Sequence, residues 1–366
     1  QKPSGARIMA YTTIDDPSAF HQTLLYSGNN DGGGQTHTNT GNSDLQPDWL
    51  WIKHRTSASY NHYMVDSSRG ENNSVHLRLV PNGTQAEADG YTHNFATDGW
   101  ESASNNATIN GSATYAAWQW KCNGGTTTSF NESGNNPGGT RQVNTTAGFS
   151  ILDYVGTGAA GTIEHGLGKV PQWIIFKDRS SDGDNWFVYH VTTGNDSSCR
   201  LDTNGADGSD SNRFNNTSPT SSVFTVGASG GTNDDANPTI AYCFAPIQGF
   251  SKFGAYIGNG NTDGPFVYTG FRPAWLLIKE TGNTNEWRLF DNKRNPHNPV
   301  TTHFESDGAG AETDGGTTHN QFNFLSNGFK IRTSNAGNNR SGGEYMYMTF
   351  AEFPIVSSEG VPGPAR

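Results

Sequence analysis

The sequence has little charge and few strong helix formers. Only 16% of its 366 residues are charged, against about 25% in an average globular domain. Ala, Leu, Glu and Lys are scarce, while Gly alone supplies 46 residues. Helical bundles, coiled coils and doubly wound α/β enzymes need long runs of helix formers. The composition therefore argues against all three classes.

Several other features are absent. The three cysteines, Cys122, Cys199 and Cys243, are odd in number and widely spaced, so neither a disulfide framework nor a Cys-pair zinc motif is expected. No apolar run approaches the 18 residues of a membrane span, and no signal-peptide pattern is present. The net charge is −11 and no Lys/Arg cluster occurs, which argues against a nucleic-acid partner.

Aromatic residues are plentiful, and they argue against disorder. The chain holds 20 Phe, 13 Tyr and 9 Trp, which can bury large apolar surfaces, whereas disordered chains are poor in aromatics. Short aromatic-rich segments alternate with turns built from Asn-Gly, Asp-Gly and Gly-Asn pairs. The sequence therefore predicts an all-β protein.

An internal repeat is the most informative feature. A Pro-x-Trp motif followed by three apolar residues and Lys occurs without gaps at Pro47–Lys53, Pro171–Lys177 and Pro273–Lys279. A later strand closes each copy, at Tyr115–Trp120, Ile240–Phe244 and Tyr345–Phe350. Three ungapped copies indicate a unit of about 100 residues used three times.

The repeat sets the expected domain organisation. We expect three tandem homologous β-sandwich units, of jelly-roll or lectin-like type. Each should have its own core, dominated by Trp49, Trp173 or Trp275. The expected segments are an N-terminal extension (1–8), repeat 1 (9–123), a Gly/Thr/Asn-rich linker or loop (124–147), repeat 2 (148–247), repeat 3 (248–356) and a C-terminal tail (357–366).

Two glycine motifs match known functional patterns by letter alone. Gly156–Gly161 fits the dinucleotide fingerprint G-x-G-x-x-G, but no helical pattern follows it, so we interpret it as a hairpin loop. Gly227–Gly231 fits the nucleophile pattern G-x-S-x-G, but it lies in a loop without the strand–turn–helix context. His165 is interpreted as a turn or strand-end residue rather than a metal ligand.

Charged residues offer two further candidates. Acidic loops at 182–184, 207–210 and 234–235 are interpreted as solvated turns, with Ca²⁺ binding as the alternative. Asp66 with Arg69, and Asp291 with Arg294, are interpreted as local turn-stabilising pairs rather than catalytic pairs. No acid–base pair, nucleophile or metal cluster recurs in the three copies, so neither catalytic residues nor a cofactor is predicted.

Several segments resemble structural proteins of marine tailed bacteriophages. The similar words are Met9–Pro17, Phe20–Thr23, Tyr26–Asn29, Gly148–Ser150, His165–Gly168, Gly249–Gly254 and Tyr256–Trp275. The proteins they resemble are described as tail-fibre-like and are otherwise uncharacterised. The resemblance spans nearly the whole chain and implies a repeated-domain virion protein on an exposed appendage. It carries over no functional residues.

Three functions follow as hypotheses. The first is a non-enzymatic virion appendage protein, a homotrimer at the virion surface whose loops contact a host glycan or protein, with aromatic rings stacking on sugars. The second is a secreted bacterial adhesin of lectin-like type. The third, and least favoured, is a capsule depolymerase, which would hold two carboxylates in a cleft.

Overall fold

The structure, a computed structural model, describes residues 10–316 and 321–364. It is nearly all β, and its named strand pairs are antiparallel. The helices of the described residues are the short η1 (Pro17–Ala19) and α1 (Ala336–Asn339). No helix in this part of the chain has the length and apolar character needed to cross a membrane.

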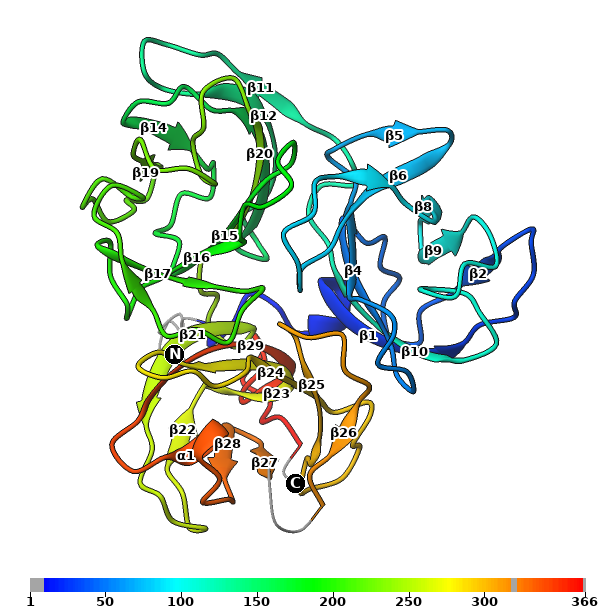
Figure 1. The fold of residues 1–366 in the computed structure, drawn as a ribbon. Coiled ribbons are helices and arrows are strands. Elements are labelled where there is room, and N and C mark those ends of the chain that lie inside the picture. Colours follow the sequence, from blue (N-terminus) through cyan, green and yellow to red (C-terminus); the bar gives the residue numbers. More distant parts are fainter. Residues whose placement is uncertain (1–9, 317–320, 365–366) are drawn as a thin grey trace, which may run out of the picture.

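The strands fall into three groups in chain order, which we call lobes 1, 2 and 3 (Figure 1). Lobe 1 contains β1 (His21–Ser27), β2 (Gln35–His37), β3 (Trp49–His54), β4 (Tyr63–Asp66), β5 (Glu71–Asn72), β6 (Val75–Leu79), β7 (Ala88–Asp89), β8 (Thr92–Ala96), β9 (Gly99–Ser102) and β10 (Thr114–Trp120). Lobe 2 contains β11 (Thr128–Phe130), β12 (Gly138–Asn144), β13 (Phe149–Val155), β14 (Gly161–Glu164), β15 (Trp173–Asp178), β16 (Phe187–His190), β17 (Ser197–Arg200), β18 (Gly208–Ser209), β19 (Val223–Val226) and β20 (Pro238–Phe244). Lobe 3 contains β21 (Ser251–Ile257), β22 (Phe266–Tyr268), β23 (Phe271–Glu280), β24 (Arg288–Asp291), β25 (Thr302–Glu305), β26 (Thr313–Asp314), β27 (Phe322–Leu325), β28 (Gly328–Ile331) and β29 (Glu344–Pro354).

Each lobe has one large and one small sheet, in a sandwich-like arrangement. The large sheets share the core orders β1-β10-β3-β4-β6, β13-β20-β15-β16-β17 and β21-β29-β23-β24-β25. The predicted Pro-x-Trp strands are β3, β15 and β23, and the predicted closing strands are β10, β20 and β29. Both sets are confirmed, and each Pro-x-Trp strand pairs with the closing strand of its own lobe.

The two faces of each large sheet pack differently. Side chains alternate along a strand, so Trp173 and Ile175 point one way while Ile174 and Phe176 point the other. Ile174 and Phe176 belong to a cluster within lobe 2. Trp173 instead joins a cluster drawn from all three lobes.

The prediction of three separate tryptophan-led cores is therefore wrong. Trp49, Trp173 and Trp275 are fully buried, but they lie together in one central core. Each lobe's private core lies on the opposite face of its large sheet. Figure 1 shows the lobes arranged around this common centre. The run of apolar residues after each Trp arises because the strand is covered on both faces.

The segment 124–147 also differs from expectation, because it is not a linker or loop. Strand β12 pairs with β13 over seven residues, from Gly138 with Val155 to Asn144 with Phe149, and β11 pairs with β12. The outer edge of β13 offers a row of backbone groups that the hairpin satisfies. The Gly/Thr/Asn composition of this segment suggested a flexible linker. Composition alone does not reveal that the edge of β13 is available for pairing.

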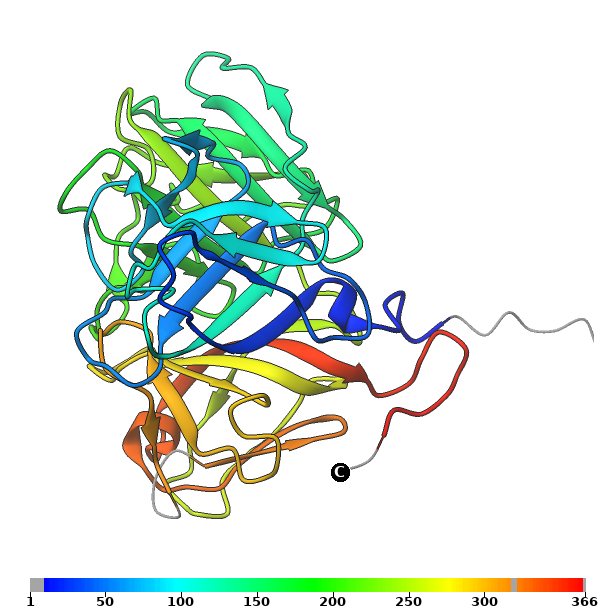
Figure 2. The ribbon, with the colours of Figure 1, turned by 90° about the vertical axis from the view of Figure 1, so that its right-hand side faces the viewer.

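The two described ends of the chain lie on the same side of the molecule (Figure 2). The backbone N–H of Ser358 donates to the Asp15 carboxylate at 2.6 Å. The predicted tail from residue 357 thus folds back, and the N–H of Gly363 donates to the carbonyl of Ile355 at 2.8 Å. The predicted extension 1–8 lies outside the described residues.

Candidate functional site

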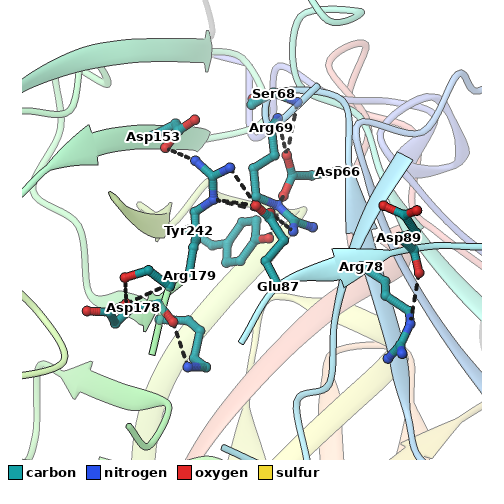
Figure 3. A network of polar contacts seen from close by, with 12 residues as sticks. Asp66, Ser68, Arg69, Arg78, Glu87, Asp89, Asp153, Asp178, Arg179 and Tyr242 are labelled. Atoms are coloured by element: carbon teal, nitrogen blue, oxygen red, sulfur yellow. Dashed lines mark hydrogen bonds and ion pairs between the residues drawn. The ribbon is translucent and has the colours of Figure 1, made fainter. Parts of the chain in front are cut away.

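The seam between lobes 1 and 2 contains a buried network of charges (Figure 3). Asp66 ends β4, and Arg69 follows it in the turn. The Arg69 Nε lies 2.6 Å from the Asp66 carboxylate, and both side chains are fully buried. The Tyr242 hydroxyl of lobe 2 donates to the same carboxylate at 2.6 Å. The predicted pair is therefore present, and the N–H groups of Ser68 and Arg69 in the turn also donate to Asp66, but the pair is buried at a seam.

Glu87 extends this network across the seam. It lies 2.6 Å from Arg69 of its own lobe and 2.6 Å from Arg179 of lobe 2. Arg179 also pairs with Asp153 at 2.6 Å. Each guanidinium thus meets two carboxylates, which is the geometry that makes buried charges tolerable.

A corresponding network lies between lobes 3 and 1. Arg294 Nε lies 2.6 Å from the Asp291 carboxylate, both buried, and the indole of Trp118 donates to Asp291 at 3.1 Å. Glu312 of lobe 3 accepts two hydrogen bonds, at 3.0 and 2.7 Å, from Arg55 of lobe 1. Arg55 and Arg179 each stand two residues after the Lys of their Pro-x-Trp motif.

Uncharged contacts cross all three seams in the same direction. The backbone N–H of Glu87 donates to the carbonyl of Arg179 at 2.7 Å. At the other two seams, the N–H of Glu312 donates to the carbonyl of Arg55 and the N–H of Asp207 donates to that of Thr281, both at 2.8 Å. Trp186 and Trp287 donate their indole N–H groups to the carbonyls of Val80 and Arg200 at 2.9 and 2.8 Å. His62 Nε2 lies 3.2 Å from the Glu305 carbonyl. The three seams therefore follow one cyclic pattern. Lobe 2 contacts lobe 1, lobe 3 contacts lobe 2 and lobe 1 contacts lobe 3 through corresponding segments.

The charges on the first seam shift each other's protonation. Burial alone would raise the pKa of Asp66, but Arg69 and the Tyr242 hydroxyl outweigh burial and hold it below the usual range. Burial raises the pKa of Tyr242 well above its usual value, so its hydroxyl stays protonated and donates. At neutral pH the network therefore has fixed donors and acceptors.

Among residues 10–316 and 321–364, no guanidinium–carboxylate pair crosses the seam between lobes 2 and 3. Lobe 2 places His190 where β4 and β24 end in aspartates, and the register of each strand with its Pro-x-Trp neighbour fixes the equivalence. A pocket here is lined by the carboxylates of Asp202, Glu286, Glu305 and Asp307. Burial raises the pKa of Asp307 to about 7.

The predicted acidic loops divide between two places. Asp184 and Asp234 meet Asp178, with one carboxylate oxygen of each within 4.8 Å of the others. Asp178 already accepts hydrogen bonds from the N–H groups of Ser180 and Ser181 and from the amide of Asn237. The loop 207–210 lies elsewhere, where Asp210 pairs with Arg213 at 2.8 Å.

The two glycine motifs lie in loops. Gly156–Gly161 connects β13 to the start of β14 with no helix after it, but it is not the predicted hairpin loop, because β14 pairs with β19 in a separate two-stranded sheet. In the loop after β19, the Ser229 hydroxyl donates to Asp210 at 2.7 Å. His165 is buried, with Nε2 3.1 Å from the Thr220 carbonyl and Nδ1 accepting from the N–H of Leu167. These contacts agree with its interpretation as a turn residue.

Sequence reasoning missed the seam partners Glu87, Arg179, Tyr242 and Trp118. The only available signal was the arginine at the same place after two copies of the Pro-x-Trp motif. All three cysteines are buried and free.

The fold and the seams together define a three-lobed, all-β protein whose antiparallel sheets share one central core. Residues 16–354 match the family model described as a domain of unknown function, DUF7483, and the chain belongs to this family. No curated protein matches the chain.

Proposed function

We propose that this chain is a non-enzymatic component of a virion appendage, built from three tandem homologous β-sandwich units, that contacts a host glycan or protein. The common strand order of the large sheets supports the tandem units. The sequence resemblance to tail-fibre-like phage proteins supports the location at the virion surface. The boundaries of the three repeats, and the homotrimer, stay predictions.

The observation that carries the proposal is the cyclic set of seam contacts around one core. Buried indoles and guanidinium–carboxylate pairs lie at the centre, while polar loops of Gly, Asn and Thr occupy the outside. In this arrangement, the buried contacts hold three loop-bearing surfaces in fixed positions. This suits a rigid presenting head better than an enzyme with one deep cleft.

Exposed aromatic side chains on lobe 3 support a binding role. Phe266 and Tyr268 on β22 are 44% and 49% exposed. The ammonium of Lys252 lies 5.5 Å from the centroid of the Tyr268 ring, and the Tyr11 hydroxyl lies 3.2 Å from that of Tyr268. Rings held in this way present apolar faces to sugars or to a protein partner.

The experiment has two arms. Mass spectrometry of purified particles from a phage that encodes this chain should detect it, and detection only on bacterial surfaces would favour the adhesin instead. A glycan array with the full chain should give saturable binding to host surface glycans. Incubation with host capsule should release no reducing ends, and their release would assign a depolymerase. Light scattering of the full chain tests the homotrimer, which a monomer would contradict.

A further inference from the structure

A pocket of about 150 Å³ lies between lobes 1 and 3. Its walls come from β1, residues 40–42, the start of β23, the turn after β24 and the end of β29. One water needs only about 10–15 Å³ on the same measure. The pocket can therefore hold a small organic group, and its lining includes none of the paired charged side chains of the two seam networks described above.

Three polar side chains in its wall are buried, and two of them have a buried polar atom without a hydrogen-bond partner among the described residues. His21, Thr23 and Asn292 are 4%, 5% and 6% exposed. His21 Nδ1 lies 3.0 Å from the Gln119 carbonyl, so it carries the proton and Nε2 is a bare acceptor. Within the described part of the chain, neither His21 Nε2 nor Thr23 Oγ1 has a hydrogen-bond partner. The Asn292 side chain lines the same pocket.

The other lobes do not place unpartnered polar groups at these strand positions. His21 and Thr23 pair with Trp120 and Trp118 of the closing strand. The corresponding residues are Phe149 and Ile151 in lobe 2, and Ser251 and Phe253 in lobe 3. Ser251 is partnered, since its Oγ accepts from the N–H of Ile247 at 3.1 Å. A buried polar group without a hydrogen-bond partner destabilises the folded chain, so packing alone does not account for His21 and Thr23 in lobe 1.

We infer that this pocket binds one ring of a neutral sugar, with ring hydroxyls donating to His21 Nε2 and pairing with Thr23 Oγ1 and the Asn292 amide. Hydroxyls both donate and accept, which matches a bare imidazole nitrogen beside a hydroxyl and an amide. Phe353, Ala274 and Ala351 give the same pocket an apolar side for C–H groups. This inference deepens the glycan-binding part of the proposed function and rests on it.

Protonation and charge favour a neutral ligand. Burial lowers the pKa of His21 to about 3, so the ring stays an acceptor at physiological pH. Lys293 is the only cation in the lining, beside Asp16 and Glu352. Asp16 accepts from Ser18 and Ser43, while Glu352 pairs with Arg272 at 2.8 Å. The lining therefore has no excess positive charge that would select an anion.

The experiment titrates the full chain with glucose, galactose, mannose and N-acetylglucosamine, and separately with lactose and maltose. Binding is followed by calorimetry and by the ¹⁵N chemical shift of His21 Nε2, which moves when that atom accepts a hydrogen bond. We expect saturable binding of at least one sugar. H21F, which installs the lobe 2 residue, should weaken it at least tenfold. A free monosaccharide that binds as tightly as its disaccharide identifies a single-ring site, and tighter binding of the disaccharide identifies the end of a longer glycan.

His190→Phe is the matched control. Its Nε2 is equally buried and unpartnered among the described residues, but His190 lies outside the pocket lining. Should both variants lose binding, rim substitution Asn42→Ala decides, because Asn42 is exposed and lines only the mouth. Retained affinity in H21F overturns the inference, and so does retained affinity in N42A when both histidine variants lose binding. If the glycan array is positive but none of the six sugars moves the His21 signal, this site is refuted while the proposed function stands.

Discussion

Trp173→Ala tests whether the three lobes unfold as one body. The side chain is fully buried in the central core beside Trp287, whose ring centroid lies 6.0 Å away in lobe 3. Truncating a buried Trp costs about 3–5 kcal/mol. Because this indole contacts another lobe as well as its own, we expect the loss to be felt by the whole molecule.

The shift in melting temperature distinguishes the two cases. Unfolding entropy is about 2.1 cal/mol/K per residue, which gives about 0.8 kcal/mol/K for 366 residues. A loss of 3–5 kcal/mol then lowers one common transition by roughly 4–6 °C. If lobe 2 melted alone as about 120 residues, the same loss would lower its own transition by roughly 12–20 °C and leave the rest in place.

Scanning calorimetry is the assay, because it compares the calorimetric and van't Hoff enthalpies. Equal enthalpies and one modestly shifted peak are expected for Trp173→Ala. The control is Val170→Ala, at a 45% exposed position just before the motif, which should change stability by less than about 0.5 kcal/mol. A separate early peak holding about a third of the total enthalpy would refute a shared core.

Three further outcomes are expected. Asp66→Asn leaves the buried Arg69 guanidinium with Glu87 as its remaining carboxylate and should cost about 3–5 kcal/mol in urea denaturation. In the parent chain, the contribution of the low Asp66 pKa to stability should be lost as pH falls below about 4. Burial lowers the pKa values of His21 and His190 to about 3. Between pH 6.5 and 3, the unfolded chain therefore binds protons that the folded chain does not bind. As pH falls through this range, the free energy of unfolding should decrease by about 1.4 kcal/mol per pH unit for each histidine. EDTA should change the melting temperature by less than about 1 °C, because the Asp178 oxygens already have protein donors, and a larger drop would favour the Ca²⁺ alternative.

Much of the fold could be predicted from local patterns. Trp173 to Phe176 is a continuous apolar run after a proline, which indicates a strand covered on both faces. Two of the three copies end the next strand in Asp with Arg three residues later, and those pairs form as predicted. These features depend on residues near one another in sequence, so a pattern can reveal them.

The destination of each face could not be predicted in the same way. Alternation shows that Trp173 and Ile174 point to opposite sides, but nothing local says that one side meets two other sheets. The partner of Asp66 in lobe 2, Tyr242, lies 176 residues away in sequence. Hairpin 128–144 was missed for a related reason, since its strand character depends on the edge of β13 rather than on its own composition.

The unequal seams indicate what the buried charges contribute. All three seams keep the same backbone and ring contacts, but the one between lobes 2 and 3 has His190 in place of an aspartate and Thr281 in place of an arginine. In the described part of the chain, that seam is crossed by hydrogen bonds from Asp207 and Trp287 and by no guanidinium–carboxylate pair. A buried pair gains little over apolar packing but penalises any wrong partner strongly. We therefore expect the charges at the other two seams to specify which lobe meets which, and the shared aromatic core to supply most of the stability.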